Sequence, residues 1–511
     1  MQASLSQLAA AISGARLVPG AALDGAAPDG AQDVTVKAVS TDSRSVPPGA
    51  LFVALRGDLF DGHDFLAQVA ASGVAAVVVE ALPAGWAQCA SMVPAIVVPD
   101  TLVALGQIAH FWRRQFALPV IGVAGSNGKT TVKEMLAAIL CAAHGERGYL
   151  ATRGNFNNEI GVPLTLMRLE KNHAAAVIEL GMNHPGEIGR LSAISRPTLA
   201  LVNNAQREHQ EFMHSVHAVA LENGAVLAGL PDDGVAVFPF DDEFTGLWRT
   251  LAGARRAITF APARAAHDAR IGREGDTARA DVSCTWRPND FGNDLFVTIR
   301  TEAAALQFFV GLAAAGEHNV RNALAACACA FGIGIGLDAI KRGLEAFAPV
   351  SGRLQKKMAA HGVCVIDDSY NANPDSVLAA IDVLAQAAPP RILVLGDMGE
   401  VGSQGRQFHE EIGAYAASRG IEHLLATGAL ARHLNGAEGQ NNVRHFEQFD
   451  ALVAALDDLL ARSAGHGPAT VLIKGSRFMK MERIVRHLTD PEVSPVSQDS
   501  PDSQKNNKEV H

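Results

Sequence analysis

One short loop in this sequence combines the residue types that bind phosphate. It reads GSNGKTT and consists of Gly125, Ser126, Asn127, Gly128, Lys129, Thr130 and Thr131. Glycines let the backbone close around phosphates, a lysine adds positive charge beside them, and a threonine hydroxyl can bind Mg²⁺. The spacing is G-x-x-G-K-T, shorter than the common G-x-x-x-x-G-K-[ST] loop, because Val123 stands where that loop has its first glycine. The loop predicts nucleotide binding, with a plain glycine-rich turn as the alternative.

Two further side chains follow predicted strands and are candidates for the same site. Glu179 ends the apolar run 174–181, where its carboxylate would lie close to a Mg²⁺ bound by the loop. His209 comes shortly after the apolar run 197–205. Each residue has an ordinary alternative, because most glutamates lie on the surface and a single histidine is usually structural or exposed.

An asparagine-rich loop, residues 151–166, offers candidate substrate contacts. Asn157 and Asn158 could hydrogen-bond a polar substrate, or they could simply tolerate a left-handed turn. The residue types alone leave both interpretations open.

A second polar cluster lies at a predicted domain junction. Arg353 could reach a phosphate held by the neighbouring domain, and Asp368, at a strand end, could accept hydrogen bonds from a ribose. The same segment would also make a turn and a helix cap, with Asn373 or Asp375 as the capping residue.

The elements that must position these residues are short apolar strands alternating with helices. This alternation predicts an α/β fold with mostly parallel sheets covered by helices on both faces. Polar residues cluster where strands end, and in open parallel sheets ligands bind outside the carboxyl ends of the strands. We therefore expect the ligands to lie near the following side chains, although any one of them could be an ordinary loop residue: Glu179, Asn203, Asn204, Asp367, Asp368, Asp397 and Lys474.

The length of 511 residues is too great for one core and favours three domains. Changes in pattern along the chain predict a small α/β domain over 1–101, a central domain over 102–345, and a third α/β domain over 346–487. The remaining segment, 488–511, is polar and contains prolines, which predicts disorder.

Composition excludes several classes of function. A hydrophobic content of 48% and a charged content of 19% are typical of a globular protein, and the net charge of −10 disfavours nucleic acids and anionic membranes as partners. No apolar run approaches the roughly 18–20 residues of a membrane span, and the N-terminus lacks the features of a signal peptide. Six scattered cysteines favour a reducing, cytoplasmic location. We expect a cytoplasmic monomer without stable membrane insertion.

A series of motifs, taken in order, resembles one family. The loop after its strand is followed by GNFNNEIGVP, VIELGMNHPGEI, NN…EHQEF, GEHNVRNALAA, SGRL, DDSYNANPDS and LGDMGEVG. Together they are similar to the Mur ligases of peptidoglycan synthesis, over about residues 35–485. The resemblance implies a small N-terminal domain that binds a UDP-sugar, a central ATPase domain of the P-loop type with a mostly parallel sheet, and a Rossmann-like C-terminal domain.

The resemblance also implies ATP and Mg²⁺ as cofactors and assigns roles to individual residues. Lys129, Glu179 and His209 would be catalytic, and Thr130, Glu179 and His209 would bind the metal. Asn319 would lie by the nucleotide base, Arg353 by the γ-phosphate and Asp368 by the ribose. The positions that match substrate motifs are Ser40, Asp42, Ser43 and Arg44 on the UDP side, and Thr152, Asn157 and Asn158 on the muramoyl-peptide side.

The segments DDSYNANP and GDMGE resemble the family member that joins D-alanyl-D-alanine to a UDP-N-acetylmuramoyl tripeptide. The implied reaction has two steps. ATP first phosphorylates the carboxylate to an acyl phosphate, and the amine of the dipeptide then displaces the phosphate. The first step depends mainly on positioning and on neutralising charge.

One position departs from the family pattern. Fourteen residues after His209 the family usually has a lysine, which in several relatives is carbamylated and holds a second Mg²⁺. Here the position is Asn223, preceded by Glu222, so carbamylation is impossible there. We expect Glu222 or Asn223 to supply the metal-side oxygen, with a site of one metal, or one completed by water, as the alternative.

Two other functions compete with this interpretation. A folate polyglutamate ligase shares the loop but is disfavoured by DDSYNANP. A nucleotide-dependent switch or transport ATPase would usually carry the longer loop and an aspartate at the end of an apolar strand for Mg²⁺.

Overall fold

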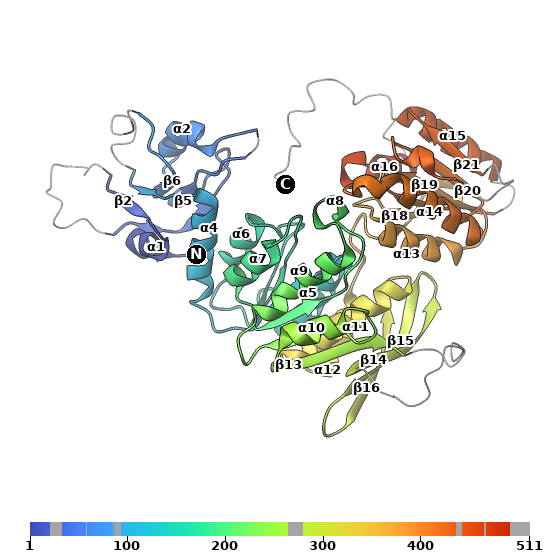
Figure 1. The fold of residues 1–511 in the computed structure, drawn as a ribbon, viewed down its shortest axis with the longest axis horizontal. Coiled ribbons are helices and arrows are strands. Elements are labelled where there is room, and N and C mark those ends of the chain that lie inside the picture. Colours follow the sequence, from blue (N-terminus) through green and yellow to red (C-terminus); the bar gives the residue numbers. More distant parts are fainter. Residues whose placement is uncertain are drawn as a thin grey trace.

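The computed structural model describes residues 1–20, 33–57, 59–84, 86, 93–263, 280–435, 442–463 and 467–490. Within these ranges the chain folds into three α/β domains, coloured blue, green to yellow, and orange to red along the sequence (Figure 1). The predicted disordered segment lies outside the described residues except for its first three positions. Two of these, 488 and 489, belong to the last helix, so the predicted boundary falls too early.

The first domain is built on a five-stranded sheet with the order β2-β7-β6-β5-β4, in which only the β2–β7 pair is antiparallel. A separate antiparallel pair joins β1 to β3. The elements are β1 (Ala3–Ser4), α1 (Leu5–Ala11), β2 (Arg16–Val18), β3 (Thr35–Val36), β4 (Ala38–Ser40), β5 (Ala50–Val53), α2 (Leu66–Ala71), β6 (Ala76–Val79) and β7 (Ala95–Val97).

Helix α4 (Thr101–Arg113) joins the first domain to the second (Figure 1). Its N-cap, Asp100, accepts a hydrogen bond from the backbone N–H of Val103, which satisfies one of the free donors of the first turn. Leu105 and Ile108 of this helix are fully buried in a cluster that includes side chains of both domains. One continuous apolar core therefore connects the two domains.

The central domain contains a nine-stranded sheet with the order β16-β15-β14-β13-β12-β11-β8-β10-β9. Its strands are β8 (Val120–Ala124), β9 (Tyr149–Ala151), β10 (Ala175–Glu179), β11 (Leu199–Val202), β12 (Val235–Pro239), β13 (Arg256–Pro262), β14 (Val282–Asn289), β15 (Gly292–Arg300) and β16 (Ala305–Leu312). Its helices are α5 (Lys129–His144), α6 (Gly161–Leu166), α7 (Glu187–Ser195), α8 (Gln210–Met213), α9 (Val216–Ala228), α10 (Thr245–Ala252), α11 (Glu317–Gly332) and α12 (Leu337–Ala346).

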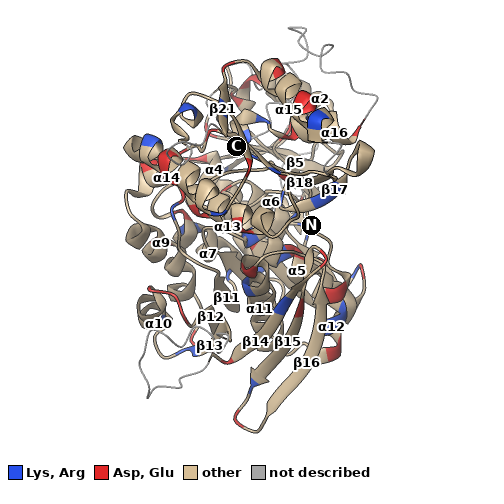
Figure 2. Cartoon of the chain, turned by 90° about the vertical axis from the view of Figure 1, so that its right-hand side faces the viewer, with Lys and Arg blue, Asp and Glu red and all other residues tan. Residues whose placement is uncertain are grey.

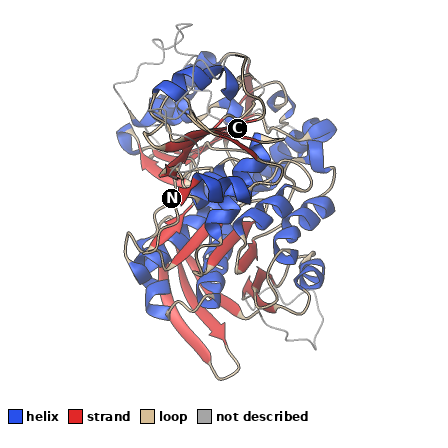
Figure 3. Ribbon diagram, turned by 90° about the vertical axis from the view of Figure 1, so that its left-hand side faces the viewer, coloured by secondary structure: helices blue, strands red, loops and turns tan. Residues whose placement is uncertain are grey.

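Helices cover both faces of this sheet, as the apolar strands predict (Figure 3). Helices α4, α6, α7, α9 and α10 contribute to the apolar cluster on one face, and α5, α11 and α12 contribute to the cluster on the other. Strand β8 is buried at every position, which explains its unbroken apolar sequence. The predicted mostly parallel α/β fold is therefore confirmed for this domain.

Strands β14, β15 and β16 form an antiparallel extension of the central sheet, which the sequence analysis did not anticipate. The turn between β14 and β15 brings Asn289 opposite Gly292, where a side chain would collide with the backbone oxygen of Leu312. Alternating polar and apolar residues along β15 leave one face of this extension exposed, with Phe296 and Phe309 paired across the strands.

The third domain has a six-stranded sheet with the order β17-β18-β22-β19-β20-β21, parallel except for the β17–β18 pair. Helices α13 and α14 belong to the apolar cluster on one face, and α15 and α16 to that on the other. The elements are β17 (Gln355–Met358), β18 (Cys364–Asp368), α13 (Pro374–Ala385), β19 (Arg391–Gly396), α14 (Gly405–Ser418), β20 (His423–Thr427), β21 (Val443–Phe446), α15 (Phe449–Ser463), β22 (Thr470–Lys474) and α16 (Glu482–Thr489).

Figure 2 shows acidic and basic positions interspersed over the domains in that view. Among the described residues, no helix is long and apolar enough to span a membrane.

His318, near the start of α11, is expected to make the stability of the protein sensitive to acid. Its Nε2 is buried without a hydrogen-bond partner, and burial, assisted by the charge of Lys474, lowers its pKa from 6.5 to about 4, against the opposing effect of Asp382. Between these values the unfolded chain binds a proton that the folded chain does not, so stability falls as the pH is lowered through this window. We expect the urea midpoint to fall from pH 6.5 to pH 4, and to fall less in His318→Gln.

A matched control for this measurement is His144→Gln, because His144 is exposed at the end of α5. If His318→Gln keeps the full acid sensitivity of the wild type while His144→Gln is unchanged, the buried imidazole is not the source.

Candidate active site

The phosphate-binding loop lies between β8 and α5, with the strand–loop–helix geometry that the sequence predicts. Gly125 and Gly128 have positive φ angles of 133° and 81°. A Cβ at Gly128 would collide with the amides of Asn203 and Asn322, so glycine is required there both by conformation and by space. The loop therefore makes a left-handed turn that leads directly into the N-terminus of α5, where the first backbone N–H groups of a helix can meet an anion.

Lys129 is the first residue of α5, and its side chain is only 14% exposed. Its Nζ donates to the backbone oxygens of Gly125 at 2.5 Å and Ser126 at 3.1 Å, and lies 3.5 Å from Oε2 of Glu208. The ammonium group is thus folded over the loop, and it would have to leave these contacts to reach the phosphates of a nucleotide. Thr131 lies in the same first turn of the helix and is half-buried.

Thr130 and Glu179 are brought together as the sequence predicts. The Thr130 hydroxyl donates to Oε1 of Glu179 at 3.0 Å, and the Asn157 side-chain amide donates to the same oxygen at 2.9 Å. The backbone N–H of Glu179 donates to the hydroxyl of Thr152. Asn158 lies nearby, but its side-chain oxygen accepts backbone N–H groups at the start of α6, including that of Gly161 at 2.8 Å, as in the turn alternative.

The same pair of side chains fits a divalent cation. Glu179 is 2% exposed, and its second oxygen, Oε2, is buried without a hydrogen-bond partner. A buried carboxylate oxygen of this kind calls for a cation. Mg²⁺ is commonly held by one or two carboxylates together with substrate phosphates and water. This agrees with the described residues, in which no three His, Cys, Asp or Glu side chains cluster closely enough to hold a metal by themselves.

The loop is supported from behind by asparagines, as expected for polar residues at strand ends. Asn204, after β11, accepts from the backbone N–H of Asn127 at 2.8 Å. Asn203 donates to the Asn127 backbone oxygen and to Asn322, which in turn donates to Asn319. Asn319, predicted to lie by the nucleotide base, is 6% exposed, and it uses its amide N–H to bind the backbone oxygen of Ala315.

His209 has a left-handed backbone and lies at the boundary with the third domain. Its Nδ1 lies 2.5 Å from Oε2 of Glu400, in the segment GDMGE, and its Nε2 lies 3.9 Å from Oε2 of Glu208. His209 therefore lies near the loop, with Glu208 between them. Thr130 and Glu179 pair on another side of the loop.

The third domain contacts the phosphate loop directly. The side-chain amides of Asn127 and Asn373 exchange hydrogen bonds of 2.9 and 3.3 Å, and Asn373 is the N-cap of α13, one of the two caps considered for it. Arg207 reaches from the central domain to Asp375 at 2.7 Å and to Glu411 at 2.7 Å. The third domain is thus held against the edge of the nucleotide site by charged and amide contacts.

Asp368 and Arg353 lie within the third domain, each already in contact with a neighbour. Asp368 accepts from Lys474 Nζ at 2.5 Å and from the backbone N–H of Leu354 at 3.1 Å. Burial raises the pKa of the Asp368 carboxyl, and the charge of Lys474 opposes this effect. The guanidinium of Arg353 lies over the ring of Tyr370, 4.3 Å from its centre. Nucleotide contacts by these two residues remain predictions.

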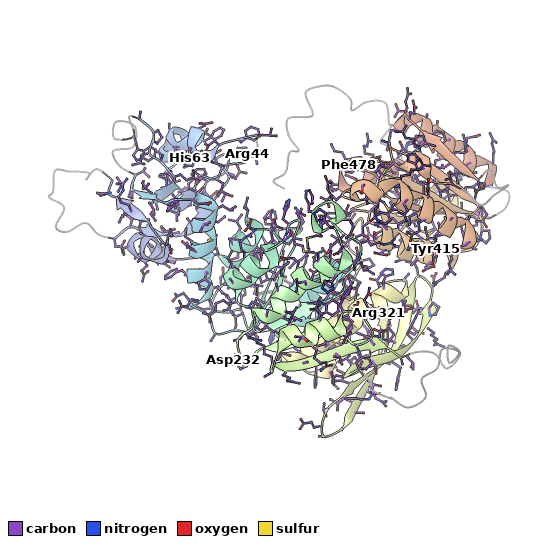
Figure 4. All side chains as sticks on the ribbon, viewed as in Figure 1. Arg44, His63, Asp232, Arg321, Tyr415 and Phe478 are labelled. Atoms are coloured by element: carbon purple, nitrogen blue, oxygen red, sulfur yellow. The ribbon has the colours of Figure 1, made fainter. Side chains whose placement is uncertain are left out.

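The predicted UDP-side residues lie at the last position of β4, Ser40, and on the loop that follows it. The Arg44 guanidinium donates to both carboxylate oxygens of Asp42, at 2.9 and 2.8 Å, and the Ser40 hydroxyl bridges to the backbone of Asp42. The hydrogen bonds from Arg44 lower the pKa of Asp42. Ser43 lies in the turn between them. Figure 4 shows Arg44 on the side of the first domain that faces the third, where Phe478 is labelled.

Of the two residues expected at the metal, Glu222 and Asn223, only Asn223 lies at the phosphate loop. Glu222 accepts the backbone N–H groups of Gly186 and Ile188, each at 2.8 Å, and so caps the start of α7. The expectation that Glu222 faces the metal is wrong, because both of its oxygens bind this helix end. Asn223 is 1% exposed, and its side-chain oxygen accepts the backbone N–H of Gly125 at 2.9 Å.

The sequence analysis missed Glu208, a buried carboxylate 6% exposed that lies between Lys129, His209 and Asn223. Its position directly before His209, shortly after a strand end, was the available signal.

Three family models match this chain. The Mur ligase middle domain matches residues 123–330, the glutamate ligase domain of Mur ligases matches 352–477, and a domain described as the catalytic domain of the Mur ligase family matches 35–113. These matches together include the phosphate loop, Glu179, His209 and the segment that carries Arg44.

Named proteins and solved structures agree with the family models. The chain is 38% identical over 458 residues to the UDP-N-acetylmuramoyl-tripeptide–D-alanyl-D-alanine ligase of Escherichia coli, covering 90% of this chain and 95% of that protein. It is 32% identical to the enzyme of that name from Bacillus subtilis, covering 91% and 95%. The crystal structure of MurF from Acinetobacter baumannii superposes with a TM-score of 0.81 at 34% identity, covering 96% and 99%. The chain belongs to the Mur ligase family.

Proposed function

We propose that this chain is an ATP-dependent ligase that joins D-alanyl-D-alanine to a UDP-N-acetylmuramoyl tripeptide and releases ADP and phosphate. The product is the UDP-linked pentapeptide precursor of peptidoglycan. The enzymes of this name cover nearly the whole chain, and the phosphate loop with its paired Thr130 and Glu179 is the observation that carries the proposal.

Different residues are proposed to act in the first step, the phosphorylation of the substrate carboxylate. ATP supplies the phosphoryl group that activates the substrate carboxylate as an acyl phosphate, and Mg²⁺ would neutralise charge on the phosphates. The backbone N–H groups at the N-terminus of α5 would bind the phosphates, and Lys129 would neutralise charge on the group in transfer. Thr130 and Glu179 on one side of the loop, and His209 on the other, are proposed as metal ligands, with Asn157 orienting Glu179 through its amide.

The outer domains are proposed to position the substrates. Ser40, Asp42, Ser43 and Arg44 would bind the UDP moiety, while Thr152, Asn157 and Asn158 would lie along the muramoyl peptide. Asn319, Arg353 and Asp368 would contact the base, γ-phosphate and ribose of ATP. The chain is further proposed to act as a monomer in the cytoplasm; the five described cysteines, all free, are compatible with a reducing compartment.

The proposed reaction is tested by the release of phosphate. With purified protein, ATP and Mg²⁺, we expect release only when the UDP-N-acetylmuramoyl tripeptide and D-alanyl-D-alanine are both present. Release with single amino acids in place of the dipeptide would contradict the proposed acceptor.

A folate polyglutamate ligase is the second candidate, because a folylpolyglutamate synthase from Mycobacterium tuberculosis shares the fold at a TM-score of 0.58 and 17% identity. At that identity the likeness concerns the fold alone. Phosphate release driven by a folate and glutamate, with none from the muramoyl substrate, would favour this candidate.

Arg44 provides a test of the UDP side. Its side chain is 81% exposed, but the fork of hydrogen bonds to Asp42 holds the guanidinium in one orientation. If it binds a phosphate of the UDP moiety, Arg44→Ala removes binding that is equal in the ground state and in the transition state. We expect the KM for the muramoyl substrate to rise about 10-fold, as for one lost charged contact, with kcat and the KM for ATP little changed.

Arg16→Ala is a suitable control, because Arg16 is an exposed residue of β2 in the same domain. An unchanged KM in Arg44→Ala would remove this residue from the proposed UDP site.

A further inference from the structure

Glu208 is a buried carboxylate at the phosphate loop that none of the roles above uses. It lies in the segment between β11 and α8, directly before His209. Its side chain is 6% exposed. A carboxylate so far removed from water is costly unless a positive charge or several hydrogen-bond donors compensate it.

Three groups converge on this carboxylate. Oε2 lies 3.5 Å from Nζ of Lys129 and 3.9 Å from Nε2 of His209, and Oε1 lies 3.5 Å from the side-chain nitrogen of Asn223. The contact with Asn223 is long, and Nε2 of His209 is beyond hydrogen-bond distance. Lys129 is therefore the main compensating charge for Glu208 in this structure.

Lys129 cannot neutralise Glu208 and bind the phosphates of a nucleotide at the same time. Its Nζ now also binds the backbone oxygens of Gly125 and Ser126, and it must leave these contacts to reach the phosphates. Phosphates would then bring several negative charges next to a buried carboxylate that has lost its ammonium partner. Negative groups next to each other in a poorly solvated site repel strongly unless a cation lies between them.

Asn223 cannot supply that compensation. Its side-chain oxygen is occupied by the Gly125 backbone N–H at 2.9 Å, and its amide group carries no charge. Glu222, the neighbouring acid, is directed to the start of α7. Of the described carboxylates on the Lys129 side of the loop, Glu208 is the one in contact with the lysine, while Glu179 binds Thr130 on the other side.

We propose that Glu208 is a ligand for a divalent cation that enters with the nucleotide, replacing Lys129 as its charge partner. The loop would then have a carboxylate on each side, Glu179 beside Thr130 and Glu208 beside Lys129, each facing a cation bound to the phosphates. This inference rests on the proposed use of ATP, but it does not depend on which acids or amines the enzyme joins.

The test compares Mn²⁺ binding to the wild type and to Glu208→Gln, which keeps the shape of the side chain and removes its charge. The probes are Mn²⁺, followed by its electron paramagnetic resonance, and the non-hydrolysable ATP analogue with a methylene bridge between the β- and γ-phosphates. We expect Glu208→Gln to bind one Mn²⁺ fewer than the wild type in the presence of the analogue, or to bind that ion roughly 10–100-fold more weakly.

A second measurement separates a cation ligand from a partner of Lys129 alone. In EDTA, Glu208→Gln should bind the analogue at least as tightly as the wild type, because a carboxylate that competes for Lys129 has been removed. With Mn²⁺ the order should reverse. If the variant differs from the wild type by the same factor with and without metal, Glu208 acts only through Lys129 and the proposal is overturned.

The matched control is Glu211→Gln, because Glu211 is exposed in the neighbouring helix α8 and should leave Mn²⁺ binding unchanged. Glu208→Asp should restore part of the lost Mn²⁺ binding, since it returns the charge. An equal Mn²⁺ count in the wild type and Glu208→Gln, with equal affinities, would also overturn the assignment. These experiments use no acceptor substrate, so their outcome is independent of whether D-alanyl-D-alanine is the amine.

Discussion

Lys129→Met is expected to lower kcat for phosphate release by about two to three orders of magnitude, with a much smaller loss in nucleotide affinity. The backbone N–H groups at the start of α5 remain in the variant, so the phosphates keep most of their binding site. What is lost is the single ammonium group folded over the loop at 2.5 Å from the Gly125 oxygen. Because charge develops on the phosphoryl group during transfer, removing this ammonium group lowers mainly kcat.

The measurement needs both initial rates at saturating substrates and an independent titration of ADP. Lys171→Met serves as the control, because Lys171 is exposed in the turn before β10 and neutralising it leaves the site untouched. A Lys129→Met enzyme within about fivefold of the wild-type kcat would show that the loop backbone and metal carry the charge alone.

The sequence predicted the parts of the site whose geometry depends on residues that are close together in the chain. Strand β8, the glycine turn and helix α5 are contiguous, so their geometry follows from one short stretch of the chain. The pairing of Thr130 with Glu179 was also predictable, because β8 and β10 are adjacent parallel strands whose carboxyl ends meet at one edge.

The parts that the sequence missed depend on contacts between distant segments. Glu208 differs from an ordinary loop glutamate only because Lys129, 79 positions earlier in sequence, folds over it. Glu222 or Asn223 was expected at the metal from the distance along the chain to His209, whereas the structure directs Glu222 to the free N–H groups at the start of α7. A helix neighbour points about 100° away, so which of two adjacent residues faces the site depends on tertiary structure.

The antiparallel strands β14 to β16 were missed for a different reason. Their alternation of polar and apolar residues is that of a half-exposed sheet, and it differs from the unbroken apolar runs that marked the parallel strands. Unbroken apolar runs identify buried strands such as β8, whereas a half-exposed strand has no such run.

The first and third domains contact the central domain in different ways. The first shares an apolar core with the second through α4, whereas the third touches the second through polar contacts: Asn373 with the loop, Glu400 with His209, and the ion pairs of Arg207. Polar contacts exchange with water more easily than a packed core does, so they can form and break without unfolding a domain. Any rearrangement that accompanies binding is therefore expected at the boundary between the second and third domains.

Glu179→Gln is expected to reduce kcat by about two orders of magnitude or more and to raise the Mg²⁺ concentration needed for half-maximal rate. The substitution keeps an acceptor for Thr130 and Asn157 at Oε1, but it puts an amide NH₂ where the buried, unpartnered Oε2 now lies. That group carries no negative charge and would repel a cation, while the fold loses no hydrogen bond. Glu170→Gln, an exposed change before the same strand, should leave both quantities unchanged. A Glu179→Gln enzyme with wild-type Mg²⁺ dependence would mean that the orphaned oxygen faces no metal, and Thr130 and the phosphates would then have to hold the ion without it.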